Sequence, residues 1–238
     1  MSIQPKIAVI IPALNEERAI GRVLSELPKE LIYQLIVVDN GSNDLTCKIA
    51  YQLGATVVTE SKRGYGAACL RGLTLVKPEI DIIAFLDADY SDYPDDLSLI
   101  IEPIKLGFAD MVIGSRVAAY EQGSLTPQQI FGNWLATRLI KLFWGFDYSD
   151  LGPFRAIRAS SLYKLQMCDN NFGWTVEMQI KAIKHQLKIQ EVPVRYKKRL
   201  GKSKISGTLS GSIKAGAKIL YLIAKYGLAS FHPIKGAN

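Results

Sequence analysis

Residues 80–89 decide the fold of this 238-residue chain: Ile-Asp-Ile-Ile-Ala-Phe-Leu-Asp-Ala-Asp. A mostly apolar run, about as long as a buried strand, ends there in two acids, Asp87 and Asp89. Similar runs rich in Ile and Val lie at residues 7–11, 35–38, 56–58 and 111–113. Runs without polar alternation are typical of strands covered on both faces, so the sequence predicts a buried, mostly parallel sheet.

Helix-length segments separate these strands, at residues 16–27, 45–53, 66–76 and 94–106. Alternating strands and helices predict a doubly wound, Rossmann-like α/β fold. The pattern changes after Arg116, where we expect a helix over residues 127–144, a loop over 150–155, a helix over 175–185, a strand over 189–194, a basic loop over 197–204 and a terminal amphipathic helix. No repeat or linker divides the chain, so we predict a single domain over residues 1–238.

The composition excludes several classes of protein. With 48% hydrophobic and 21% charged residues the chain is neither disordered nor fibrous. Its three cysteines, Cys47, Cys69 and Cys168, are far apart and lack metal-ligand spacing, so we expect neither a disulfide framework nor a zinc site. We therefore expect the protein to lie in a reducing compartment. The first ten residues lack the charged start and long apolar stretch of a secretion signal.

The net charge of +7 is unevenly distributed. Residues 181–238 carry thirteen Lys or Arg and a single acid, Glu191, whereas the rest of the chain is net acidic. This asymmetry indicates a polyanionic partner, either nucleic acid or an anionic membrane face. The apolar stretch at residues 213–231 is interrupted by Lys214, Lys218 and Lys225. A membrane span needs roughly 20 mostly apolar residues, so we expect this stretch to lie on a surface.

Ligands of open parallel sheets bind outside the carboxyl ends of the strands. Polar or turn-forming residues follow all five predicted strands, at residues 12–17, 39–44, 62–66, 87–89 and 114–116. Asp87 and Asp89 then face the same crevice as Asp39, and one or two carboxylates in such a place hold divalent cations that bridge phosphates. A solvated surface turn is the alternative interpretation of the acidic pair.

A glycine-rich turn, Arg63-Gly64-Tyr65-Gly66, follows the third predicted strand. Glycines permit close approach of a phosphate, and the following helix offers a positive N-terminus. The turn is not a dinucleotide-binding fingerprint, because Cys69 stands where the last glycine belongs. An ordinary glycine turn before a helix is the alternative.

Five stretches in order carry a family resemblance: PALNEE (12–17), VDNGSND (38–44), RGYGAA (63–68), DADYSDYP (87–94) and IGSR (113–116). They resemble the inverting glycosyltransferases of family 2, which have the GT-A fold, and within them the dolichyl- or polyprenyl-phosphate hexose synthases. The resemblance extends to residues 152–155, 175–178 and 199–204. It implies a nucleotide-sugar-binding half over residues 1–116, an acceptor half over 117–205 and a basic amphipathic helix over 206–238.

The resemblance also implies a set of donor-binding residues. Those at the base and ribose would be Pro12, Leu14, Asn15, Glu16, Asp39 and Asn40. Arg63 and Gly66 would approach the nucleotide, while Asp87 and Asp89, with Ala88 between them, would hold Mg²⁺ or Mn²⁺ on the diphosphate. Such a cation neutralises the charge that develops on the leaving diphosphate, which gives Asp89 a catalytic role.

Two positions depart from the family pattern. Asn40 stands where the family commonly has a second Asp, at a position that helps to read the base. Ser91 stands where polyprenyl-phosphate mannose synthases often carry Gln. Both departures weaken an assignment to GDP-mannose and favour UDP-glucose.

The acceptor side is predicted from charge and motif position. The residues that match positions around an acceptor phosphate are Arg116, Arg155, Arg199, Ser203 and Lys204. A solvated basic loop is the alternative. A phosphate acceptor is already an anion, whereas a hydroxyl acceptor needs a general base, for which Asp150 and Glu177 are the candidates. Otherwise Asp150 is a turn residue and Glu177 a first-turn helical acid.

The sequence thus predicts a cytoplasmic, metal-dependent, inverting hexosyltransferase that moves glucose from UDP-glucose to polyprenyl or dolichyl phosphate. We expect the aromatic and apolar helical faces around Trp134 and Ile213 to contact the cytoplasmic membrane surface. Nucleic acid is not an expected partner, and a homo-oligomer is left open. The alternatives are GDP-mannose or another donor, a hydroxyl acceptor on a different lipid or small molecule, a non-catalytic polyanion binder and a nicotinamide dehydrogenase.

Overall fold

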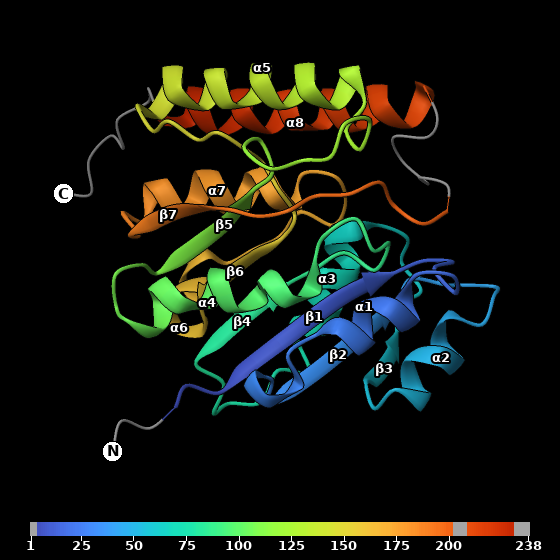
Figure 1. Ribbon diagram of the computed structural model, residues 1–238. Helices are drawn as coiled ribbons and strands as arrows, with labels where there is room; N and C mark the ends of the chain where they lie inside the picture. Colours follow the sequence, from blue (N-terminus) through green and yellow to red (C-terminus); the bar gives the residue numbers. More distant parts are fainter. Residues whose placement is uncertain (1–3, 202–208, 231–238) are drawn as a thin grey trace.

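A seven-stranded sheet runs through the computed structural model, which describes residues 4–201 and 209–230 (Figure 1). Its strands are β1 (Ile7–Ala13), β2 (Gln34–Asp39), β3 (Thr56–Thr59), β4 (Ile82–Phe85), β5 (Met111–Ser115), β6 (Arg155–Arg158) and β7 (Ile189–Pro193). Their order is β3-β2-β1-β4-β6-β5-β7, and within the described ranges β6 alone runs antiparallel to its neighbours. The predicted doubly wound, mostly parallel sheet is confirmed.

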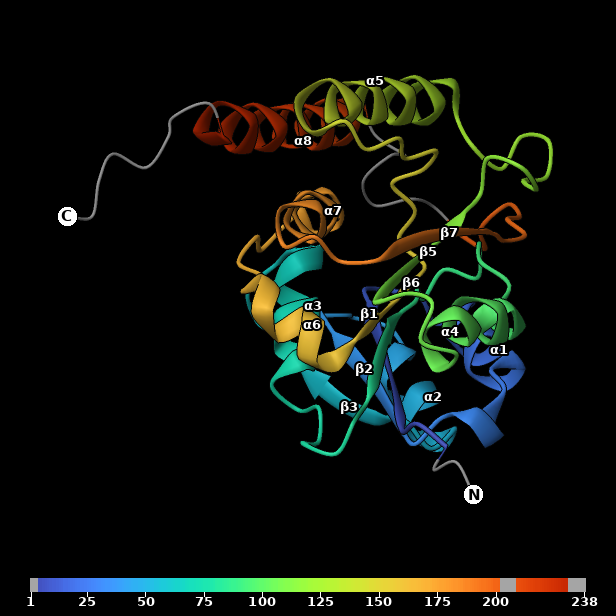
Figure 2. The same ribbon diagram turned by 90° about the vertical axis from the view of Figure 1, so that its left-hand side faces the viewer.

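Helices cover both faces of the sheet and add a further layer on one side. They are α1 (Ile20–Glu26), α2 (Thr46–Gln52), α3 (Tyr65–Leu73), α4 (Leu97–Lys105), α5 (Pro127–Trp144), α6 (Ala159–Leu165), α7 (Trp174–Lys184) and α8 (Leu209–Ser230), with 3₁₀ turns η1 (Lys29–Leu31) and η2 (Pro94–Asp96). Figure 2 shows α3, α6 and α7 on one face and α1, α2 and α4 on the other. Helices α5 and α8 pack against each other, and α8 also contacts α7.

Strand β1 shows why the predicted strands lack polar alternation. Ala8 and Ile10 belong to the core beneath α3 and α7, whereas Val9 and Ile11 belong to the core beneath α1 and α4. All four are completely buried. Because both faces of the strand are covered, every position is apolar.

The expected loop over residues 150–155 continues into β6 and α6, which the sequence did not predict. Strand β6 is only four residues long and has Arg at both ends, so it shows no apolar run. Its register with β4, where Phe85 lies opposite Arg155, makes it a strand. Tertiary pairing therefore decides this element, not local preference.

The predicted bounds of α5 are confirmed by its ends. Thr126 and Gln129 form a reciprocal capping box around Pro127, and Gly145 closes the helix with a φ of 74°. The terminal helix is also present, as α8. None of the helices in residues 4–201 and 209–230 combines the length and apolarity needed to cross a bilayer.

Gly72 lets α3 approach the sheet closely, because a Cβ atom there would lie 2.6 Å from Ile10 Cγ2. We expect Gly72→Ala to lower the free energy of unfolding by about 1–3 kcal/mol, as overpacked cores do. Gly132→Ala on α5 is the matched control, since nothing lies within 4 Å of its added Cβ. Helix propensity should then raise the free energy of unfolding by roughly 0.5–1 kcal/mol. Urea unfolding compares the two variants, and changes of the same sign would contradict the close packing.

Candidate active site

Three carboxyl groups gather beyond the end of β4: Asp87, Asp89 and Asp92, here called the acidic cluster. Asp89 and Asp92 are 6% and 1% exposed. Asp87 Oδ1 and both Asp92 carboxyl oxygens are shielded from solvent and have no hydrogen-bond partner among the described residues. Asp92 lies within the DADYSDYP stretch but was not among the predicted site residues; its spacing of five from Asp87 was the available signal.

Burial and mutual repulsion make the ionised form of the acidic cluster unfavourable. Desolvation, together with the charge of Asp89, raises the pKa of Asp87 to about 7. Desolvation and the charges of Asp87 and Asp89 raise the pKa of Asp92 well above its ordinary value. Buried carboxylates that repel one another in this way favour binding of a proton or a cation.

Arg199 brings the basic part of the chain to this cluster. Its Nη2 atom lies 2.7 Å from Asp89 Oδ2 and 3.4 Å from Glu16 Oε1. The adjacent Leu200 N–H donates to the Asp89 carbonyl at 3.0 Å. A predicted acceptor residue thus meets two predicted donor residues. Ser203 and Lys204 lie outside the described residues.

Ser91 fixes the orientation of Asp89. Its backbone N–H and its hydroxyl both donate to Asp89 Oδ1, at 2.9 and 2.5 Å. Its departure from the family pattern therefore has a local structural role, because a longer side chain would place its polar atoms elsewhere.

Asn40 supports the neighbouring loop. Its Nδ2 atom donates to the carbonyls of Glu60 and Lys62, at 3.0 and 2.8 Å, and its Oδ1 accepts from the Gly64 N–H at 2.8 Å. An ionised Asp has no N–H to donate to those two carbonyls. The amide is explained by the loop it holds, so its departure from the family pattern is no evidence about the base.

The glycines at 64 and 66 make room for the protein's own backbone, so their small size has a structural reason apart from any nucleotide. An added Cβ on Gly66 would lie 2.1 Å from the Asp169 carbonyl oxygen, and one on Gly64 would lie 2.1 Å from that of Asn170. The Gly66 N–H also donates to the Asn171 carbonyl, at 3.3 Å. Residues 169–171 therefore pack against one side of the start of α3.

The ends of β1 and β2 are tied together by predicted donor residues. The Asn15 N–H donates to Ser42 Oγ, and Asn15 Oδ1 accepts from the Asn43 N–H, both at 2.8 Å. The Asp39 carboxylate accepts from the N–H groups of Gly41 and Ser42. These bonds join the two loops that follow β1 and β2.

The remaining predicted donor residues lie around the same edge. Arg63 Nη2 donates to the Gly41 carbonyl at 3.0 Å, which links the third strand end to the second. Pro12 and Leu14 are half-buried beside the end of β1. Ala88 is buried within the acidic stretch. The structure therefore brings the strand ends to one edge of the sheet, as expected.

Arg116 and Asp150 form a bidentate ion pair. Arg116 Nε and Nη2 lie 2.7 Å from the two Asp150 oxygens, and the Arg116 N–H donates to the same carboxylate at 2.9 Å. Asp150 is 1% exposed. Asp150 is therefore the ion-pair partner of Arg116 in this structure, and the roles expected for the two residues in catalysis and acceptor binding stay predictions.

Arg155, expected at the acceptor phosphate, is completely buried. Its guanidinium donates to the carbonyls of Thr175, at 3.0 Å, and of Leu151 and Gly152. Desolvation lowers its pKa to about 10. Arg155 therefore joins the loop before β6 to the first turn of α7.

Glu177 is also completely buried, and its partners are structural. Its carboxylate lies 2.8 Å from Lys181 Nζ and accepts from the Asp169 N–H at 2.8 Å and the Tyr226 hydroxyl at 3.2 Å. Desolvation raises the pKa of Glu177, but hydrogen bonds from Cys168 and Lys181 outweigh it and leave that pKa below its ordinary value. Glu177 is therefore held by structural partners, and its role as a general base stays a prediction.

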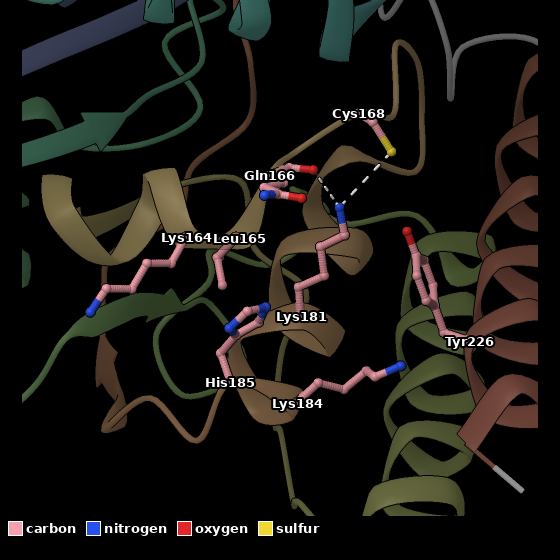
Figure 3. Close-up of a pocket in the computed structure, with 8 residues that line it drawn as sticks. All are labelled: Lys164, Leu165, Gln166, Cys168, Lys181, Lys184, His185 and Tyr226. Carbon is pink, nitrogen blue, oxygen red and sulfur yellow. Dashed lines mark hydrogen bonds between the residues drawn. The ribbon is translucent and has the colours of Figure 1, made fainter. Parts of the chain in front are cut away.

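A cavity of about 550 Å³ opens beside α7, next to Lys181 and Tyr226, which contact Glu177 (Figure 3). It is lined by Lys164, Leu165, Gln166, Cys168, Lys181, Lys184, His185 and Tyr226. These residues come from the ends of α6 and α7 and from α8, not from the strand-end edge. The cavity is therefore separate from the acidic cluster.

The comparison with protein families decides the identity. The family described as glycosyl transferase family 2 matches residues 8–165, which contain the strand ends and the acidic cluster. The chain belongs to glycosyltransferase family 2. It is therefore an enzyme of sugar transfer, as the motifs predicted.

Curated relatives of this glycosyltransferase span most of its length. An uncharacterised glycosyltransferase of Mycobacterium tuberculosis is 33% identical over 88% of this chain and 94% of its own. A dolichyl-phosphate hexose transferase of Haloferax volcanii is 28% identical over 87% and 89%. A UDP-N-acetylglucosamine–dolichyl-phosphate N-acetylglucosaminyltransferase of Methanococcus voltae is 30% identical over 79% and 84%.

Solved structures confirm the fold. Glucosyl-3-phosphoglycerate synthase from Mycobacterium tuberculosis, in complex with Mn²⁺, UDP-glucose and phosphoglyceric acid, superposes with a TM-score of 0.75. The match covers 98% of this chain and 82% of that one, at 22% identity. The expected GT-A architecture is thereby confirmed.

Asn40→Asp tests the loop-supporting role of the amide. Two carbonyls would lose their donor and face a carboxylate, so we expect the free energy of unfolding to fall by about 1–3 kcal/mol. Asn43→Asp, at an exposed position of the same turn, is the control and should change it by less than about 0.5 kcal/mol. Urea unfolding measures both, and equal effects would contradict the role given to Asn40.

Proposed function

We propose that this glycosyltransferase moves a hexose, glucose first among the candidates, from UDP-glucose to polyprenyl or dolichyl phosphate with inversion. The contact of Arg199 with Asp89, at 2.7 Å, carries the proposal. It brings a cation from the basic part of the chain to the carboxylates at the strand ends. Groups suited to an anionic acceptor and groups suited to a metal-bound donor therefore share one place.

The pair Asp87 and Asp89, together with substrate phosphates, suits a divalent cation. Asp87 Oδ1 is buried without a partner in the described part of the chain. Desolvation and the charge of Asp89 raise the pKa of Asp87 despite the nearby charges of Arg199 and Arg116. Mg²⁺ is commonly held by one or two carboxylates with substrate phosphates and water completing the shell. Asp87 and Asp89 would hold Mg²⁺ or Mn²⁺, which would neutralise the charge on the departing diphosphate. Structures of the fold relative contain Mn²⁺ or Mg²⁺ with UDP.

A phosphate acceptor fits the side chains better than a hydroxyl acceptor. Both expected bases, Asp150 and Glu177, are engaged in ion pairs. A phosphate brings its own negative charge to the anomeric carbon and needs no base. The names of two relatives, a dolichyl-phosphate hexose transferase and a dolichyl-phosphate N-acetylglucosaminyltransferase, support the lipid phosphate.

The two departures from the family pattern do not distinguish between UDP-glucose and GDP-mannose. Asn40 and Ser91 have structural explanations, so they no longer argue against GDP-mannose. UDP is supported by the name of one relative and by the ligands of the fold relative. UDP-glucose is therefore kept as the first donor to test and GDP-mannose as the second.

The layer formed by α5 and α8 supports contact with the cytoplasmic face of a membrane. Its exposed large apolar side chains are Ile130, Phe131, Trp134 and Leu142 on α5 and Ile213, Leu220, Tyr221 and Leu228 on α8. Arg138, Lys214 and Lys225 are exposed on the same two helices. Apolar side chains flanked by cations are typical of helices that lie in the interface of anionic lipids.

Asp89→Asn tests the role of the acidic cluster in transfer. We expect Mn²⁺-dependent transfer of labelled hexose to short-chain polyprenyl phosphate to fall by at least about 100-fold, the scale expected when a group that stabilises transition-state charge is removed. Asp95→Asn, which removes an exposed acid paired with Arg195, should keep the wild-type rate. Full activity of Asp89→Asn would refute the metal role.

Donor and acceptor panels in the same assay separate the alternatives. Label from GDP-mannose and none from UDP-glucose would replace the donor but keep the enzyme class. Transfer to a hydroxyl-bearing lipid and none to the phosphate would replace the acceptor.

Phe131→Glu tests the membrane contact. We expect it to reduce co-sedimentation with anionic phospholipid vesicles several-fold, because a charge replaces an apolar side chain that is 61% exposed on α5. Tyr51→Glu makes a similar change at a 75% exposed aromatic on α2, on the other face of the sheet, and should leave binding unchanged. Equal binding by both variants would contradict this surface.

A further inference from the structure

Asp169 is a buried charge that no part of the proposed transfer uses. Its Oδ1 atom accepts from the N–H groups of Asn171 and Gly173, at 2.8 and 3.0 Å. Its Oδ2 atom lies 2.9 Å from Lys218 Nζ on α8. One carboxylate therefore shapes residues 168–173, here called the linking loop, and ties them to α8.

The linking loop rests directly on the start of α3. The Asn170 carbonyl accepts from the Ala67 N–H at 2.9 Å, and the carbonyl of Asp169 fills the space beside Gly66. The loop and the helix are tightly packed at this point, because an added Cβ at Gly66 would lie 2.1 Å from that oxygen. A displacement of the loop therefore moves the start of α3.

The start of α3 belongs to the donor side of the active site. Tyr65, its first residue, lies close to Asp87. Gly64, just before it, is bonded to Asn40, and Arg63 reaches the Gly41 carbonyl. The position of the turn at residues 63–66 thus depends on both Asn40 and the linking loop.

A second set of contacts joins the same loop to α8. Glu177 accepts from the Asp169 N–H and from the Tyr226 hydroxyl, and Leu222 packs where a side chain at Gly173 would stand. Figure 3 shows Lys181 directed at Gln166 and Cys168, with the Tyr226 hydroxyl turned toward the same place. The inner face of α8 therefore holds the linking loop at more than one point.

We propose that Asp169 is a positioning residue for the nucleotide-sugar donor. It holds the linking loop against the start of α3. Through its ion pair with Lys218, it makes the position of the turn at residues 63–66 depend on α8. The inference rests on the proposed function, since it concerns the donor site. It gives α8 two faces with separate roles, an outer apolar face and an inner face that supports the donor side.

Calorimetric titration with UDP and with GDP, each with Mn²⁺ and without acceptor or vesicles, tests this role. Asp169→Asn keeps an oxygen for the two loop N–H groups but loses the ion pair, and Lys218→Met removes the same ion pair from a position on the surface of α8. We expect each to raise the Kd of the nucleotide that binds the wild type about five- to tenfold, the scale of typical coupling between sites. The double variant should show no further increase.

Three controls make the outcome decisive. Asp147→Asn removes a surface ion pair with Lys141 and should leave the Kd unchanged. In the transfer assay Asp169→Asn and Lys218→Met should raise the KM for donor, while kcat and the KM for acceptor change little, which general loss of structure would not produce. Urea unfolding checks that each variant is folded at the assay temperature. If Asp169→Asn does not fold, Lys218→Met alone tests the ion pair.

Each remaining outcome overturns a definite claim. A wild-type Kd in Lys218→Met overturns the positioning role while leaving the proposed function intact. Additive increases in the double variant overturn the claim that both residues act through their ion pair. A wild-type chain that binds neither nucleotide overturns the proposed function and this inference together.

Discussion

Burying like charges at one place is the constraint on which the rest of this site depends. Asp87, Asp89 and Asp92 repel one another where water is scarce, and three of their oxygens lack partners in the described structure. The surrounding residues offset only part of this cost. Ser91 and Arg199 hold Asp89, while Arg116 is nearby but already paired with Asp150. The uncompensated charge is what a cation carrying a diphosphate would neutralise.

The predicted features that were confirmed are local in sequence. Strand β4 follows from an apolar run and the acids at its end from the next residues, so a parallel sheet places them at one edge. The ends of α5 are likewise determined by the residues that flank it, Thr126 and Gly145. Strand β6 was not predicted because it is defined by its pairing with β4 and β5, which are distant in sequence.

The sequence did not show the contacts that several predicted site residues make with other parts of the chain. Gly66 faces residues 169–171, and Arg155 and Glu177 are buried beneath contacts from α7 and α8. A family motif shows that a residue type is needed but not whether a ligand or the protein itself needs it. Asn40 is the clearest case, since its two donated bonds explain the amide without any nucleotide. Burial and hydrogen-bond partners were required to separate the two.

Anomalous diffraction from crystals grown with Mn²⁺ and UDP shows directly whether the carboxylates after β4 hold the metal of the donor. We expect one Mn²⁺ held by Asp87 and Asp89 beside the diphosphate of UDP, at the carboxyl end of β4. UDP bound in the strand-end crevice with no Mn²⁺ at these carboxylates, or Mn²⁺ held elsewhere in the chain, would contradict it.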